Sequence, residues 1–250
     1  MMRLEQLPST DEFCDATGLS FTRELDETRV KDKLSYTGRI EFAKGYMVDR
    51  YSFTSNQLFL NEEMVIPPPS SFMSKVVWRD VSRDSQIRRI KATLLPPGFI
   101  CGNSLGVVYG DKAALSSLKM LLAIMNSMIF EYQARSMLVS NHVSAGIVKQ
   151  IRVPRPRVDI NIIELVDKQL AGQDVEDDIE LAVAQLYNLS ADEYEIIVDS
   201  FKLDNERRTN IVGQYRKKSQ DGEKKNMIFN HYASSLSELD MQVIKCVPPG

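Results

Sequence analysis

Cysteine and histidine are scarce in this sequence, and their spacing excludes the common zinc sites. The three cysteines, Cys14, Cys101 and Cys246, lie far apart, and the two histidines are His142 and His231. No Cys-x-x-Cys or His-x-x-x-His pair exists, which excludes a structural zinc site and an HExxH site. An odd number of widely spaced cysteines fits a reducing compartment better than a disulfide framework. We therefore expect a cytoplasmic protein with no bound metal.

Long hydrophobic runs are also missing. The longest apolar run, Met120–Phe130, is too short to cross a bilayer, which needs about 20 apolar residues. The first residues, Met1–Gln6, do not begin the apolar core of a signal peptide. We therefore expect no membrane interaction.

Catalytic motifs are absent as well. The sequence has no Walker A pattern, no GxGxxG fingerprint and no GxSxG nucleophile elbow. The Asn/Asp-Pro-Pro-aromatic motif of base-methylating enzymes is missing, because Ile66–Pro69 lacks both the polar and the aromatic residue. Glu223–Lys225 matches the Glu-x-Lys element of metal-dependent nucleases, but it lies in a polar tail without a surrounding strand. We assign no catalytic residue to this chain, and whether it acts as an enzyme by itself stays open.

Charge is distributed unevenly along the chain, although the net charge is only −3. Residues 71–157 hold 13 basic and 4 acidic residues, a net charge of +9. Residues 158–200 hold 1 basic and 12 acidic residues, a net charge of −11. The basic block could form a cationic face for a polyanion. The alternative is that the two blocks neutralise each other in the fold.

The pattern of apolar residues predicts strands first and helices afterwards. β-branched and aromatic residues favour strands, and the predicted strands are 75–79, 89–95, 99–101 and 105–109. One long helix is predicted over Leu115–Met137, because apolar residues recur there at i, i+3 and i+4. A later helix is predicted to start with a capping box formed by Ser190 and Glu193.

These elements predict a mixed α+β fold with three parts. Residues 1–39 are expected to be a lead-in or linker. Residues 40–157 are expected to form a strand-rich domain with the long helix packed across its sheet. Residues 158–250 are expected to form a small helical region that ends in a polar tail.

Several motifs resemble those of one protein family. Trp78–Arg83 (WRDVSR), Arg88–Pro96 (RRIKATLLP) and Gly102–Ser104 (GNS) are similar to consecutive motifs in one region of type II restriction–modification enzymes. That region is the C-terminal target-recognition (specificity) region of those enzymes that have an N6-adenine DNA methyltransferase core. Leu121–Tyr132 (LLAIMNSMIFEY) resembles its long helix, and Ile179–Tyr194 (IELAVAQLYNLSADEY) resembles its helical tail.

Shorter stretches extend the resemblance. Asn141–Ser144 and Gln150–Pro154 follow in the family's order, so the resemblance covers roughly residues 40–215. The chain departs from the family at Arg152, where a proline is usual, and at Asn188, where a glycine is usual. Asparagine tolerates the left-handed conformation that ends many helices, so a helix end at Asn188 remains expected.

The resemblance implies a DNA-binding domain that reads a specific duplex sequence for an adenine-specific DNA methyltransferase, with or without a fused endonuclease. An enzyme that modifies a base must flip it out of the duplex, so a separate module has to hold and read the surrounding DNA. The family's catalytic and cofactor motifs are absent here. The methyltransferase domain and its S-adenosylmethionine are therefore expected outside this chain, in the same protein or as a subunit. No cofactor is expected in the chain itself.

The residues expected to contact DNA carry donors suited to phosphates and base edges. Arginine is favoured because its planar fork donates two parallel hydrogen bonds. The expected DNA-contacting residues are Arg79, Arg83, Arg88, Arg89, Lys91, Asn103, Arg135, Asn141 and His142. The alternative for Arg79, Arg83 and Arg88 is a surface ion pair with Asp80 or Asp84. Trp78 is expected in the core rather than as a stacking platform.

Other functions are compatible with the same sequence. The chain could be a protein-interaction or assembly module that binds a catalytic subunit without direct DNA contact. A nuclease with an unrecognised site is a third hypothesis. A helix-turn-helix reader over 175–201 is disfavoured, because Asp192, Glu193, Glu195 and Asp199 would meet the phosphates with like charge.

Overall fold

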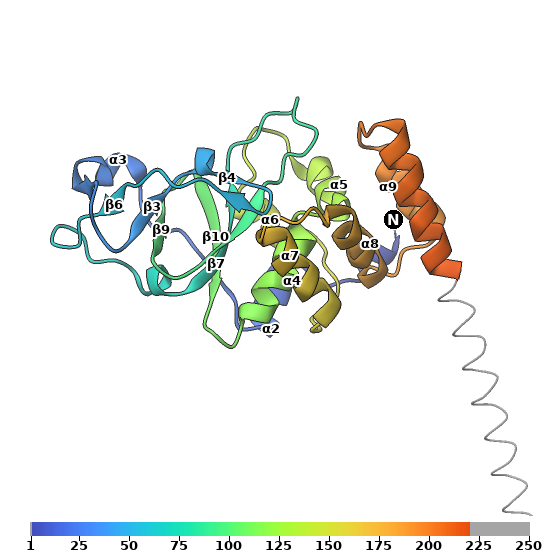
Figure 1. The fold of residues 1–250 in the computed structure, drawn as a ribbon, viewed down its shortest axis with the longest axis horizontal. Helices are drawn as coiled ribbons and strands as arrows, with labels where there is room; N and C mark the ends of the chain where they lie inside the picture. The colour runs from blue at the N-terminus through green and yellow to red at the C-terminus, as the bar shows by residue number, and fades with distance from the viewer. Residues whose placement is uncertain (1, 221–250) are drawn as a thin grey trace, which may run out of the picture. The chain divides into compact units, whose positions relative to one another are not determined.

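The computed structural model describes residues 2–220, which divide into two compact units (Figure 1). The first unit runs to Leu189 and includes Ser200–Lys202. Among the described residues, the second combines Ser190–Asp199 with residues 203–220. The expected boundaries after residues 39 and 157 both fall inside the first unit, and separate roles for those parts stay a prediction. Glu223–Lys225, His231 and Cys246 lie outside the described residues.

A four-stranded antiparallel sheet forms the centre of the first unit. Its strand order is β1-β10-β7-β8, with Val107 of β10 opposite Val77 of β7. The strands are β1 (Ser20–Thr22), β7 (Ser74–Arg79), β8 (Ala92–Leu95) and β10 (Leu105–Gly110). Trp78 on β7 is fully buried, as expected, and its indole nitrogen donates to the carbonyl of Val143 at 2.8 Å. The mixed α+β class is confirmed.

A second, mixed sheet lies beside a two-stranded one. Its order is β2-β6-β3-β9, and β3 runs parallel to β9. The strands of this sheet are β2 (Leu34–Ser35), β3 (Glu41–Ala43), β6 (Phe59–Leu60) and β9 (Phe99–Cys101). Strands β4 (Val48–Asp49) and β5 (Ser52–Phe53) pair with each other.

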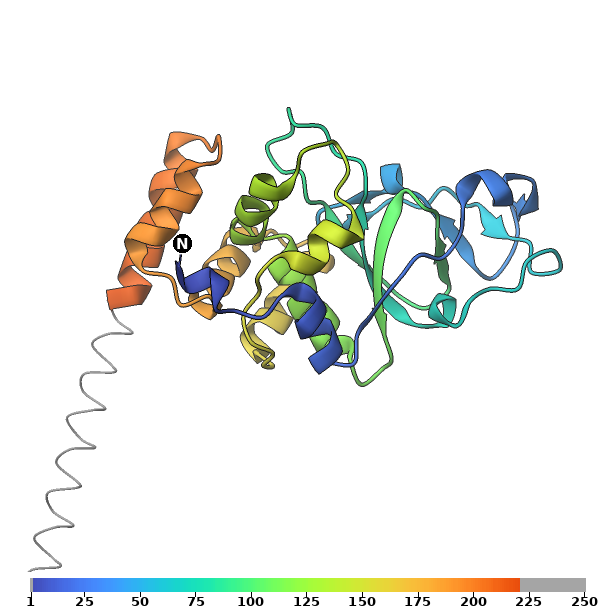
Figure 2. The same cartoon turned by 180° about the vertical axis from the view of Figure 1, so that it is seen from behind.

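Residues 2–39 contribute helices and strands to the first unit. Strand β1 pairs with β10, and Phe13, Leu19 and Val30 are buried. Helix α2 (Thr10–Ala16) packs against α6 (Figure 2). The amide of Thr10 donates to the carbonyl of Ile151 at 2.8 Å. The segment is mostly polar, so its composition did not predict that Phe13, Leu19 and Val30 would be buried. The remaining short elements of this segment are α1 (Met2–Glu5), α3 (Glu27–Val30) and a 3-10 turn at Lys31–Lys33.

The predicted long helix over Leu115–Met137 is wrong in one respect, because it is two helices. Helix α4 (Leu115–Met125) ends at Asn126, and α5 (Met128–Met137) begins after Ser127, whose extended backbone and hydroxyl cap its first turn. The buried Asn126 side chain exchanges hydrogen bonds with the backbone of Ala92. Apolar periodicity continues through the break, so the sequence pattern did not reveal that Asn126 bonds to another element and that Ser127 caps a new helix. Helix α4 contacts β7, β8 and β10.

The later helices follow the sequence pattern closely. In the first unit these are α6 (Ala145–Gln150), α7 (Ile160–Leu170) and α8 (Glu176–Leu186). Asn188 takes the left-handed conformation at φ 52°, as expected. In the second unit the capping box of Ser190 and Glu193 is confirmed at the start of α9 (Ala191–Asp199), and residues 205–220 are helical. Among the described residues, every helix is too short or too polar to cross a bilayer.

Candidate nucleic-acid interface

Two segments far apart in the sequence pair at one edge of the first unit. They are residues 80–88, which follow β7, and residues 138–143, which follow α5; we call them the paired loops (Figures 1 and 2). Val81 and His142 form an antiparallel bridge. The amide of Ser82 donates to the Asn141 carbonyl at 2.8 Å, and the amide of Val143 donates to the Asp80 carbonyl at 2.6 Å. The paired loops therefore form a short two-stranded ribbon.

Arg89 joins the two loops from inside. Its side chain is buried, and one guanidinium nitrogen donates to the carbonyls of Ser82 at 3.1 Å and Ser140 at 2.6 Å. The other terminal nitrogen lies 2.6 Å from an oxygen of Asp84. Because one group bonds to both loops, their spacing is set by a side chain as well as by the backbone bridge. Those donors are occupied within the protein.

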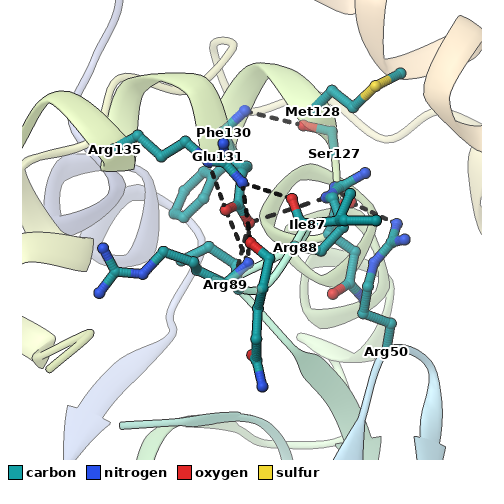
Figure 3. Close-up of polar contacts among 12 residues, drawn as sticks. Arg50, Ile87, Arg88, Arg89, Ser127, Met128, Phe130, Glu131 and Arg135 are labelled. Carbon is teal, nitrogen blue, oxygen red and sulfur yellow. Dashed lines mark hydrogen bonds and ion pairs between the residues drawn. The ribbon is translucent and has the colours of Figure 1, made fainter. Parts of the chain in front are cut away.

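Glu131 of α5 organises the base of the first loop (Figure 3). Its fully buried carboxylate accepts from the amides of Arg89 and Ile90, both at 2.8 Å, and from the Arg135 guanidinium at 3.1 Å. Arg135 also donates to the Ile87 carbonyl at 2.5 Å. The amides of Arg89 and Ile90 are therefore unavailable to a strand. This explains why β8 begins at Ala92 and not at residue 89 as predicted.

Arg88 points into a second buried cluster around Glu180 of α8. It donates to the Glu180 carboxylate at 3.1 Å and to the carbonyl of Asn126. Glu180 also accepts from the amide of Met128 at 2.9 Å, the first residue of α5. Burial, together with the charge of nearby Arg50, lowers the pKa of Arg88, while Glu180 and Glu131 oppose that shift. Figure 3 shows Arg50 and Arg88 close to each other at this cluster.

Arg79 and Lys91 are engaged with the segment around β4. Arg79 donates to the carbonyl of Val48, and Lys91 lies 2.8 Å from the carboxylate of Asp49. Burial raises the pKa of Asp49, but the hydrogen bond from Lys91 and the Arg50 amide outweigh it, so the net shift is downward. These two predicted contacts therefore have partners within the fold.

Three of the predicted contacts lie exposed on the paired loops. Arg83 and Asn141 are exposed, and within the described residues Arg83 has no carboxylate partner. The side chain of His142 is 61% exposed, and its Nδ1 lies 2.6 Å from an oxygen of Asp80. Asn103 lies apart from the loop tips, and its side-chain oxygen accepts from the amide of Glu27 at 3.2 Å.

A cavity of about 300 Å³ lies at the root of the paired loops. Asp80, Asn103 and His142 line it, together with Arg23 from the segment after β1. Arg23 was not anticipated, because only the pairing of β1 with β10 brings it near residues 80 and 142. Among the described residues, no group of three or more histidine, cysteine, aspartate or glutamate side chains is arranged to hold a metal ion.

Comparison with known proteins gives a weak likeness to a solved structure. No protein-family model matches the sequence, and no curated protein matches it. A solved structure of the type IIL restriction–modification enzyme MmeI in complex with DNA has a TM-score of 0.38 and 11% sequence identity to this chain. The match covers 86% of this chain and 35% of the MmeI chain. The chain thus spans about a third of the length of that enzyme.

Proposed function

We propose that this chain is a DNA-binding target-recognition domain of a restriction–modification enzyme. In this proposal it reads a specific duplex sequence for an adenine-N6 DNA methyltransferase. The observation that supports it best is the pairing of residues 80–88 with 138–143, which puts exposed Arg83, Asn141 and His142 on one short ribbon. These residues come from two separate motifs that suggested the family.

The shape of the paired loops suits a DNA groove. The major groove of B-DNA is about 12 Å wide and admits either a helix or a two-stranded ribbon. Guanidinium and side-chain amide groups are the usual readers of guanine and adenine edges in that groove. A ribbon held by Arg89 and Glu131 is organised before binding, which lowers the entropy lost on association.

The buried arginines take a supporting role in this proposal. The donors of Arg88, Arg89 and Arg135 are largely occupied by carboxylates and carbonyls of the fold. We therefore assign to them the positioning of the paired loops. Direct DNA contact by these residues, and by Arg79, Lys91 and Asn103, stays a prediction.

The catalytic machinery of the parent enzyme would lie outside this chain. We propose that a methyltransferase domain, in the same protein or as a subunit, binds S-adenosylmethionine and carries out the base chemistry. This chain would contribute duplex recognition only.

The test is the salt dependence of duplex binding by the Arg83→Ala variant. Each phosphate contact by a cation contributes a slope of about −0.9 to the dependence of log K on log salt concentration. We expect the variant to bind duplex DNA more weakly and with a slope that is smaller by about 1. The matched control is Arg29→Ala, which removes an exposed arginine of α3, away from the paired loops (Figure 1). Identical binding of Arg83→Ala and the parent across the salt titration would contradict the assignment.

The second candidate is a protein-interaction module that binds a catalytic subunit without DNA. The exposed apolar side chains of Val81, Ile87 and Val139 on the paired loops are the groups that such a module would use to contact its partner. Binding of the isolated methyltransferase subunit, with no affinity of the chain for duplex DNA at low salt, would establish this candidate and exclude the first.

A further inference from the structure

The paired loops expose three large apolar side chains among their polar ones. The exposed fraction is 97% for Val139 and 53% for both Val81 and Ile87. Single exposed apolar residues are common on protein surfaces. Here, however, each of the two paired loops carries at least one exposed apolar side chain. These lie on the same loops as the exposed polar residues Arg83, Asn141 and His142.

The backbone that carries these side chains is held in place. The carbonyl of Ile87 accepts from Arg135 at 2.5 Å, and the next two residues, Arg88 and Arg89, point into the fold. The carbonyl of Ser140, directly after Val139, accepts from Arg89 at 2.6 Å. The anchored positions therefore leave Ile87 and Val139 facing solvent. Valine is also stiff at χ1, so little side-chain entropy is lost when Val139 makes a contact.

The distribution of these residues favours DNA over a protein partner. A protein-docking surface usually presents a contiguous apolar patch of several hundred Å². On the paired loops the apolar residues are separated by hydrogen-bonding ones, since Ser140 and Asn141 follow Val139. A groove of DNA offers the same mixture, because donors and acceptors on the base edges alternate there with the 5-methyl group of thymine.

We propose that Val139, with Ile87, contacts thymine 5-methyl groups in the major groove and so makes the paired loops selective for A·T pairs at defined positions. This inference rests on the proposed function and identifies the thymine 5-methyl group as one of the groups that the domain recognises. The methyl group is the only apolar feature of a base edge in the major groove, and it distinguishes T·A from the other pairs. Val139 is then a specificity-determining residue, while Arg83 supplies charge that does not depend on sequence.

The experiment compares thymine with deoxyuridine, which lacks only the 5-methyl group. Duplexes that the parent chain binds best are first selected from a randomised library, and each is then remade with deoxyuridine in place of thymine. We expect the parent to lose on the order of four-fold in affinity for each contacted methyl group. Val139→Ala should bind the thymine duplex more weakly and should distinguish the two duplexes less than the parent does, because only the methyl contact of Ile87 remains.

A matched control removes an equally exposed apolar side chain elsewhere. Ile66 is 90% exposed and lies outside the paired loops, so Ile66→Ala should keep the thymine preference of the parent. Circular dichroism and the unfolding midpoint should be the same for both variants and the parent, because neither side chain is buried.

The outcomes separate this inference from the proposed function. Failure of the parent chain to bind any duplex contradicts the proposed function itself. Duplex binding that is unchanged by deoxyuridine leaves the proposed function in place and overturns the methyl contact. Equal loss by Val139→Ala on both duplexes also overturns it. The same holds if Val139→Ala weakens binding to a methyltransferase subunit and leaves DNA binding unchanged.

Discussion

At the scale of single residues, two buried glutamates position the candidate interface. Glu131 and Glu180 each accept from backbone amides and from arginine side chains, so neither charge is left uncompensated. A buried carboxylate is costly without such partners, and the cost appears in full when one partner is removed. The loop that carries Arg83 thus ends just before a residue pair, Arg89 and Ile90, whose amides are held by Glu131.

We predict that Glu131→Ala destabilises the protein by about 3 kcal/mol, because it leaves two buried amides and a guanidinium without their acceptor. The measurement is the free energy of unfolding from urea titrations. The control is Glu164→Ala, which removes an exposed carboxylate on α7 and should change stability by less than about 0.5 kcal/mol. Equal stability of the two variants would contradict the role given to Glu131.

At the scale of elements, the contact between β7 and β10 determines where the first loop begins. The indole of Trp78 on β7 lies against Gly106 on β10, which is opposite it in the sheet. A Cβ atom at residue 106 would lie 2.1 Å from the indole ring, closer than any real contact. The ring is also fixed by its hydrogen bond to the carbonyl of Val143, the residue directly after His142. Glycine is required here for close packing and not for a turn.

We predict that Gly106→Ala destabilises the protein by roughly 1–3 kcal/mol, because the indole has to move out of a filled space. Trp78 is the only tryptophan, so its fluorescence reports the change directly. The emission maximum should shift to longer wavelength in the native state as the ring becomes less buried. Gly146→Ala is the control. A Cβ on α6 meets only Ser144 Oγ at 3.8 Å, and alanine favours a helix, so stability should stay the same or rise.

Some features of these elements could be predicted from the local sequence, and others could not. Capping at Ser190, the left-handed Asn188 and burial of Trp78 follow from residues that are neighbours in the chain, and all three are confirmed. The break between α4 and α5 was missed, because it depends on the side chain of Asn126 bonding to Ala92 on a different element. The role of β1 was missed because three residues in a polar segment form a strand only when β10 is beside them.

At the scale of the whole molecule, the positive and negative blocks of the sequence partly neutralise each other. Arg88 pairs with Glu180 at 3.1 Å, and Lys119 pairs with Asp167 at 2.6 Å, each joining the +9 block to the −11 block. Of the basic block, Arg83 remains exposed on the paired loops without a carboxylate partner among the described residues. The electrostatic attraction for a polyanion is therefore smaller and more local than the composition of residues 71–157 suggests.

Among the described residues, both cysteine thiols are buried, which gives a test of the packing around them. Burial raises the pKa of Cys14 to about 12 and raises the pKa of Cys101 well above its usual value. Only thiolates react, so raising the pH from 7 to 9 should leave both native thiols almost unreactive, because pH 9 is still below the raised pKa values. A free thiol with a pKa near 8.5 would become largely reactive over that range.

We predict that the Cys246→Ser variant, which removes the cysteine outside the described residues, shows no fast reaction with a disulfide reagent at pH 8. The same variant in a denaturant should react at both remaining thiols. Fast reaction of either thiol in the native protein would contradict the burial of α2 or β9, the elements that contain Cys14 and Cys101.

The sequence by itself determined the mixed α+β class, the strands β7 to β10, the capped start of α9 and the motifs that suggest DNA recognition, because these depend on residues close together in the chain. Only the tertiary structure decided which predicted contacts remain exposed. Arg88 donates to Glu180, which lies 92 residues later in the sequence. Val81 pairs with His142, although strands β8 to β10 and helices α4 and α5 lie between them in the sequence. A charged side chain pairs with whatever lies beside it in space, so its availability to a ligand is a property of the fold and not of the neighbouring sequence.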